Sequence, residues 1–190
     1  MKKYIVLSVI FIMLFSACNQ DYSAKPSSYP RVNYPTRHYV SYDADEPFTF
    51  VYPDYASVEK SKERGALSGW VNIEYKAFNA TLHLSYFDFK TKKEYSKMTN
   101  DAHDFAYKHA SRAEEISESV FHYPHHVSGI FYDLGGNTAS TLQFFASDST
   151  SHYLRGALYF NSHPNRDSIE PMVQFIRKDL DTMLKTLRWK

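Results

Sequence analysis

Three histidines that lie close together in the sequence have the side chains of a metal site. His122, His125 and His126 surround Pro124, and imidazole nitrogens are common ligands of Zn²⁺. A zinc site needs three or four ligands that converge, whereas neighbouring side chains of an extended segment point apart. The missing ligands would have to come from elsewhere in the fold, for example from Asp101, His103 or Asp104. The pattern is more typical of a solvated loop, and we expect neither a metal nor a cofactor.

A second cluster contains the residue types of a nucleophilic triad. Asp148, Ser149, Ser151 and His152 follow each other closely. A triad requires a base within hydrogen-bond reach of the hydroxyl and an acid behind that base, and proximity in sequence does not supply this geometry. The Gly-x-Ser-x-Gly turn that exposes such a serine in many hydrolases is absent. The cluster therefore predicts a polar turn between two strands, and we expect that the protein is not an enzyme.

Arg155 is the charged residue of an otherwise apolar strand pattern, residues 153–160. If its side chain points inward it must be paired, since an unpaired buried charge is very costly. If it points outward it can contact a partner, because arginine is enriched among the residues that dominate interfaces. The sequence leaves both alternatives open.

Gly135 and Gly136 raise the question of a phosphate-binding loop. Such a loop needs a lysine and a serine or threonine at the start of a helix, whereas this glycine pair lies between two strand patterns. Because glycine tolerates positive φ angles, the pair instead indicates a hairpin turn.

The single cysteine, Cys18, directly follows an apolar run and is a candidate for lipid attachment. Lys2 and Lys3 precede that run, as in a secretory signal. Residues 14–18 resemble the bacterial lipobox, with a phenylalanine where leucine is usual. A membrane-spanning helix is disfavoured because the run of about 14 residues falls short of the roughly 20 that are needed. We expect residues 1–17 to be a signal peptide that is removed and Cys18 to carry the lipid.

Lipidation would hold the mature protein on a membrane surface and would use its only thiol. Two acyl chains already anchor a protein stably. With Cys18 acylated, no disulfide, cysteine nucleophile or thiolate ligand is left. The remaining 173 residues suffice for one domain, and the formal net charge changes from +1 to −1 when Lys2 and Lys3 leave. Because a face-wide basic excess is absent, we expect no nucleic-acid partner.

Residues 18–47 are rich in proline and tyrosine, which predicts a tether that is partly packed on the domain. Four prolines disfavour regular structure in this segment. Five tyrosines interrupt it, and a purely flexible spacer would be poorer in aromatics. We expect residues 48–190 to form a single globular domain.

Within that domain, alternating apolar residues predict strands and helical periodicity predicts two helices. The segments 71–75 and 82–86 are close enough for a hairpin. The first helix is expected at about residues 95–113, with Thr99 or Asn100 as its cap. The last helix is expected to start at a capping box formed by Asp167 and Glu170, with Pro171 in its first turn. The expected strands are 48–52, 71–75, 82–86, 116–121, 127–134, 138–146 and 153–160. We therefore predict an α+β fold, a mostly antiparallel sheet packed with two main helices.

Many blocks of the chain, from the signal segment to the C-terminus, match one family. They are Tyr34-Pro35, Tyr39, Phe48-Thr49-Phe50, Tyr52-Pro53, Trp70-Val71-Asn72-Ile73, Leu82-His83-Leu84-Ser85-Tyr86, Ala106-Tyr107-Lys108-His109, Gly135-Gly136-Asn137-Thr138-Ala139-Ser140, Gln143-Phe144-Phe145, Asp148-Ser149, Leu154-Arg155-Gly156-Ala157-Leu158-Tyr159-Phe160-Asn161 and Trp189-Lys190. Together they resemble the gliding-motility lipoprotein GldD family of the Bacteroidota. The order of strands and helices also resembles the Mog1/PsbP-type α/β/α sandwich.

The resemblance implies a non-catalytic envelope lipoprotein, a component or assembly factor of the gliding machinery and of the type IX secretion system coupled to it. Its partners would be the lipid bilayer, through acylated Cys18, and envelope proteins of that apparatus. No catalytic residues are established for the family, so none is transferred. The match at the glycine turn adds Asn137 to Arg155 as a candidate for a partner surface.

Two questions about this role stay open in the sequence. Similar families also occur in bacteria that do not glide, so the role can be secretion or envelope assembly instead of motility. Residues 19–22 carry no strongly acidic export tract, which favours the periplasmic side of the outer membrane. The alternative function is a periplasmic lipoprotein that binds a small ligand or a metal in a pocket of this aromatic-rich fold.

Three short segments resemble the Asp-Ser/Thr-apolar sequon of periplasmic O-glycosylation in Bacteroidota. They place candidate acceptors at Ser149, Ser168 and Thr182. Helix capping is the competing explanation at Asp167 and in the last helix. Ser149 is the candidate that the pattern favours most.

Overall fold

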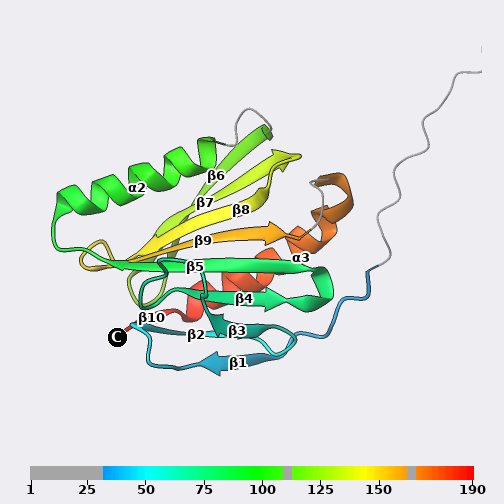
Figure 1. The fold of residues 1–190 in the computed structure, drawn as a ribbon, viewed down its shortest axis with the longest axis horizontal. Coiled ribbons are helices and arrows are strands. Elements are labelled where there is room, and N and C mark those ends of the chain that lie inside the picture. The colour runs from blue at the N-terminus through cyan, green and yellow to red at the C-terminus, as the bar shows by residue number, and fades with distance from the viewer. Residues whose placement is uncertain (1–31, 109–112, 162–165) are drawn as a thin grey trace, which may run out of the picture.

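The computed structural model describes residues 32–108, 113–161 and 166–190. These residues form two antiparallel sheets, two longer helices and one 3₁₀ turn (Figure 1). In chain order the elements are β1 Tyr39–Tyr42, β2 Phe48–Pro53, β3 Ser57–Lys60, β4 Val71–Tyr75, η1 Lys76–Phe78, β5 Ala80–Asp88, α2 Lys92–Tyr107, β6 Ala113–Tyr123, β7 Val127–Gly136, β8 Ser140–Ser147, β9 His152–Phe160, α3 Arg166–Thr186 and β10 Arg188–Trp189.

The larger sheet has seven strands in the order β3-β4-β5-β9-β8-β7-β6, and the smaller sheet has the order β1-β2-β10. The predicted hairpin of β4 and β5 is confirmed, with η1 as its link and Ile73 opposite Leu82. The glycine turn between β7 and β8 is also confirmed as a hairpin connection. In the centre, β5 pairs with β9, although α2 and three strands separate them in the sequence.

Each face of the larger sheet packs against one helix. Neighbouring residues on β8 illustrate this, because Phe144 belongs to the core on the α3 side and Phe145 to the core on the α2 side. Phe48 and Phe50 of β2 also pack into the α3 core. Figure 1 shows α3 passing behind β4 and β5, and α2 beside β6 and β7. The predicted α+β class is therefore confirmed, with helices on both faces of a mostly antiparallel sheet.

The boundaries of α2 differ from the prediction. The helix begins at Lys92, and its cap is Thr91, whose hydroxyl accepts a hydrogen bond from the Glu94 N–H while the Glu94 carboxylate accepts one from the Thr91 N–H. The predicted caps, Thr99 and Asn100, lie inside the helix, and Ala113 is the first residue of β6. A reciprocal capping box satisfies two backbone donors at once, so it fixes the start better than a residue within the apolar stripe.

The apolar stripe predicted for the last helix lies against the sheet. Its members are buried: Ile169, Val173, Ile176, Leu180, Met183, Leu184 and, just after the helix, Leu187. The helix begins at Arg166, one residue before the predicted cap Asp167, so Pro171 lies inside it instead of in its first turn. Pro171 lacks an N–H, and the helix forgoes one backbone hydrogen bond there.

The segment before β2 is held on α3 by a buried carboxylate. Asp179 is fully buried, and Arg37 Nε and Tyr39 Oη each donate to its Oδ1 at 2.9 Å. Tyr55 Oη donates to Oδ2. β1 then pairs with β2, which brings Tyr39 opposite Pro53.

Candidate functional site

The part of the larger sheet beside α2 contains an open groove. On this face α2 packs on β7 and β8, where Tyr132, Leu134 and Phe145 are buried with Ala102 and Ala106. Three open hollows of about 330, 370 and 210 Å³ follow each other along β9. The first two share His83 and Tyr159, and the first and third share Arg155. Because neighbouring hollows share lining residues, we call this row of hollows the β9 groove.

The antiparallel register determines which side chains line the groove. One row across the sheet runs from Asn72 through His83 and Ala157 to Gln143. The next row contains Ser85 and Arg155. Along β9 the lining extends from Tyr153 to Asn161, which spans about 26 Å at the usual rise of about 3.3 Å per residue.

Arg155 lies in the middle of the groove, half-buried at the edge of α2. Its guanidinium stacks over the Phe105 ring, 4.2 Å from the centroid, and its Nη2 donates to Gln143 Oε1 at 3.2 Å. Burial lowers the pKa of Arg155, while Tyr159 and Tyr153 act in the opposite direction. Among the described residues no carboxylate forms an ion pair with it. An aromatic ring and an amide thus hold the charge in place of the acid that an inward arginine was expected to need.

Gln143, on the neighbouring strand β8, holds the Arg155 guanidinium through a hydrogen bond. It is only 2% exposed, and its Oε1 is the acceptor for Arg155. Because Arg155 needs an acceptor, this bond also sets the orientation of the amide. Its Nε2 is buried and has no hydrogen-bond partner within the described part of the chain. A buried side-chain donor without a partner is unusual, since the large majority of buried side-chain polar atoms have one.

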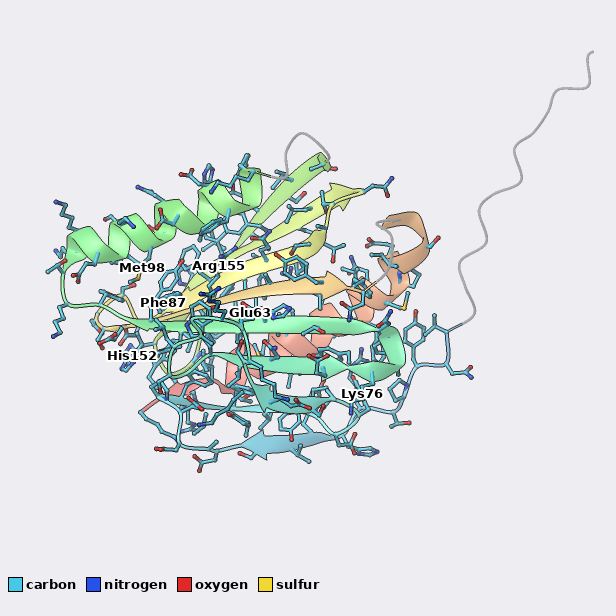
Figure 2. All side chains as sticks on the ribbon, viewed as in Figure 1. Glu63, Lys76, Phe87, Met98, His152 and Arg155 are labelled. Carbon is cyan, nitrogen blue, oxygen red and sulfur yellow. The ribbon has the colours of Figure 1, made fainter. Side chains whose placement is uncertain are left out.

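The wall opposite α2 is formed by the loop between β3 and β4. Trp70 donates from Nε1 to the Tyr86 carbonyl at 3.1 Å, and its ring meets Phe87 edge-on. Gly69 precedes it with φ +83°, and a Cβ there would lie 3.0 Å from Tyr86 Cβ, so the close approach of this loop requires glycine. In Figure 2, Glu63 of the same loop lies near Arg155 and Phe87, with Met98 of α2 on the other side.

His83 is the second ionisable group of the groove. Its Nδ1 lies 3.0 Å from Asn72 Oδ1 and 3.4 Å from Glu63 Oε1. Its ring meets Tyr159 edge-on, at 5.5 Å between centroids. Glu63 therefore lies within reach of His83, and no ion pair joins it to Arg155 in the described residues.

The histidines considered for a metal site are not brought together with the acids of α2. His125 and His126 adopt positive φ angles in the turn between β6 and β7, and His122 Nδ1 lies 3.0 Å from Ser128 Oγ. His103 instead stacks on Tyr107 within α2, at 4.2 Å between centroids. Across residues 32–108, 113–161 and 166–190, no three His, Cys, Asp or Glu side chains group in a way that could hold a metal.

The cluster at residues 148–152 forms a hydrogen-bonded turn instead of a triad. Asp148 Oδ1 accepts from the backbone N–H groups of Thr150, Ser151 and His152, each at 2.9 Å. Burial would raise the pKa of Asp148, but these bonds and the Thr150 hydroxyl outweigh it and hold the pKa well below its usual range. His152 Nδ1 lies 2.7 Å from Tyr86 Oη and its ring stacks on Trp189, and no hydrogen bond joins the ring to Ser149 or Ser151 in the described residues.

The remaining candidate residues are scattered over the fold. Asn137 is exposed in the turn after β7, away from the centre of the groove at Arg155. Ser149 is exposed at the β8–β9 turn, whereas Ser168 and Thr182 lie on α3, where the Thr182 hydroxyl donates to the Lys178 carbonyl at 3.1 Å. Glycosylation at these three positions stays a prediction. Cys18 lies outside the described residues, and its lipidation also stays a prediction.

Sequence reasoning singled out Arg155 but missed the residues that surround it. Trp70, His83, Ser85 and Tyr159 come from two strands and a loop. The alternation along β5 was a usable signal, because His83 and Ser85 are polar residues that alternate with buried Leu82, Leu84 and Tyr86.

The comparison with known proteins decides the family. The sequence model of the family described as Gliding motility lipoprotein GldD matches residues 19–189. The chain belongs to the GldD family. Its members are gliding motility lipoproteins and are generally non-catalytic, and a lipoprotein of this kind is anchored by lipid in the cell envelope. No curated protein matches the chain.

One solved structure similar to this GldD-family chain is the solution structure of cyanobacterial PsbP (CyanoP) from Synechocystis sp. PCC 6803. The sequence identity is 13% and the TM-score 0.48, over 87% of this chain and 99% of that one. In the described residues, no helix is both long and apolar enough to span a bilayer.

Proposed function

We propose that this GldD-family chain is a lipid-anchored, non-catalytic binding module of the gliding and type IX secretion machinery. Cys18 carries the anchor, and the domain faces the periplasm from the outer membrane. The observation that supports the proposal is the β9 groove. It is a long open surface with an arginine that has no ion-pair partner among the described residues. Ser85, His83 and Glu63 line the same hollow, but no hydrogen bond joins the Ser85 hydroxyl to the His83 ring in that part of the chain.

The shape of the groove favours a protein partner over a small ligand. A small-molecule site buries most of its ligand in a closed pocket. The three hollows are instead open and lie next to one another along about 26 Å of chain at β9. The interior between sheet and α3 is filled by large buried side chains such as Phe48, Phe131 and Phe144.

Anchoring makes a modest affinity sufficient. A domain restricted to one membrane face meets its fixed partners at a high effective concentration, so the second contact is nearly intramolecular. The groove therefore needs no large interface to act in a stable assembly. This agrees with a component or assembly factor that works beside other envelope proteins.

Site-specific photocrosslinking in the native host tests this function. A photoreactive residue replaces Ser85 in the groove, and a matched one replaces exposed Lys178 on α3 as the control. We expect adducts from Ser85, and not from Lys178, to a protein of the gliding or secretion machinery. Adducts only to abundant envelope proteins, equal from both positions, would contradict the proposal, and a co-purifying small molecule in the groove would favour the alternative of a ligand-binding lipoprotein.

A further inference from the structure

We propose that the β9 groove binds an extended peptide segment of the partner and that Arg155 binds a carboxylate side chain of that segment. This inference rests on the proposed function, because it names the chemistry of the partner at the same site.

The charges in the groove leave Arg155 without a counterion. The two carboxylates that line the same hollows make their contacts elsewhere, because Glu63 Oε1 lies 3.4 Å from His83 Nδ1 and Asp101 Oδ2 lies 3.3 Å from Lys97 Nζ. A half-buried guanidinium loses part of its hydration, and an anion restores that lost stabilisation. No carboxylate therefore forms an ion pair with Arg155 in the described residues, and Phe105 and Gln143 hold its guanidinium in place.

The Arg155 guanidinium is held in one orientation by two neighbouring side chains. Stacking on Phe105 fixes its plane, and the bond from Nη2 to Gln143 Oε1 fixes its rotation. The remaining N–H groups of the fork can bind a planar carboxylate with two parallel hydrogen bonds. The Nε2 of the Gln143 amide is buried beside this bond and has no hydrogen-bond partner among the described residues.

A carboxylate fits this charge balance better than a phosphate. A phosphate monoester carries about 1.5 to 2 negative charges and normally meets several basic groups. Here Glu63 and Asp101 flank Arg155, and the nearby Lys97 is paired with Asp101, so a doubly charged group would meet more repulsion than a singly charged carboxylate. The same argument disfavours a nucleic-acid strand, which carries a charge at every phosphate.

The lining of the groove favours an extended backbone as the carrier of that carboxylate. A length of about 26 Å accommodates about eight extended residues. An extended segment has unpaired N–H and C=O groups, and the groove offers His83, Ser85 and Tyr159 as polar neighbours for them. A helix satisfies its own backbone and would instead need an apolar stripe. Trp70 and Phe87 supply aromatic surface for the side chains between these polar points.

Peptide binding to the purified full-length lipoprotein in mild detergent tests the inference. One library contains N-acetylated, C-amidated eight-residue peptides with a central glutamate and random flanks, and a matched library has glutamine at that position. We expect glutamate peptides to bind at least about tenfold more tightly, as a charge-assisted hydrogen bond predicts. The preference should vanish in Arg155→Gln, weaken in Arg155→Lys and persist in Arg188→Gln, an exposed arginine outside the groove.

Several results would overturn the inference. These are equal binding of both libraries to the unmodified protein, a glutamate preference that survives Arg155→Gln, no binding of either library, or displacement of a selected peptide by millimolar acetate or inorganic phosphate. The comparison of the two libraries on the unmodified protein tests the preference for a carboxylate even if Arg155→Gln does not fold. Crosslinks from Ser85 to a machinery protein would still stand in each case, so a failure here is distinct from a failure of the proposed function.

Discussion

Replacing Asp179 with alanine should detach the N-terminal segment from α3 and destabilise the fold. The carboxylate is fully buried and accepts from Arg37, Tyr39 and Tyr55. Removing one partner of a buried ion pair costs about 3–5 kcal/mol, because the other charge is left behind. The Arg37 side chain is 29% exposed and can be partly rehydrated, which favours the lower end, about 3 kcal/mol.

This loss in the free energy of unfolding is measured by urea unfolding of the full-length chain in mild detergent, with tryptophan fluorescence as the signal. The corresponding fall in melting temperature is about 6–12 °C for a domain of this size. Asp101→Ala is the matched control, because its ion pair with Lys97 is exposed on α2 and should contribute less than about 1 kcal/mol. A loss below about 1 kcal/mol for Asp179→Ala would refute the reasoning that this carboxylate holds the segment.

Three further predictions concern packing and pH. Gly156→Ala should cost about 1–3 kcal/mol by thermal unfolding, because its Cβ would lie 2.1 Å from Phe144 Cε1, and an unchanged midpoint would contradict this. Because the pKa of Asp148 is lowered in the folded protein, its carboxylate contributes stability that is present above about pH 4 and is lost as the pH falls. The melting temperature of Asp148→Asn should therefore fall less than that of the parent protein between about pH 4 and pH 2. Burial raises the pKa of Tyr123 and Tyr132 to about 12. The stability that these two neutral tyrosines contribute is present below about pH 10 and should be lost as the pH rises toward about 12. If the tyrosinate absorbance of all tyrosines appeared before the protein unfolds, this prediction would be contradicted.

The strands that sequence patterns predict are those with one face in a core. In β4 and β5 the buried residues alternate with less buried ones, so a period of two is visible in the sequence. The missed strands are short: β1 and β3 have four residues each and β10 has two. Their pairing depends on neighbours supplied by the rest of the fold, which local alternation does not encode.

The helices show a similar division between local signals and context. The apolar stripe of α3 could be predicted from the sequence because it faces one core along the length of the helix. The capping box of Thr91 and Glu94 was also present in the sequence, but the stripe that ran on to Ala113 favoured a start and an end that were too late. Ala113 belongs to β6, where it is paired with Gly136.

The groove itself depends on strand order, which the sequence does not state. Arg155 stood out because a charge interrupted an apolar strand. Its meeting with Trp70 and His83 requires that β5 lie beside β9, a pairing between segments about 70 residues apart. Only this long-range register turns separate polar residues into one surface.

A single blocking substitution in the native host tests most directly whether the groove carries the function. Ser85→Trp fills the central hollow, and Gln174→Trp on the exposed side of α3 is the matched control. With equal protein levels, lipid anchoring and melting temperatures, we predict that Ser85→Trp abolishes gliding and type IX secretion while Gln174→Trp preserves both. Full gliding and secretion with the groove filled would contradict the account.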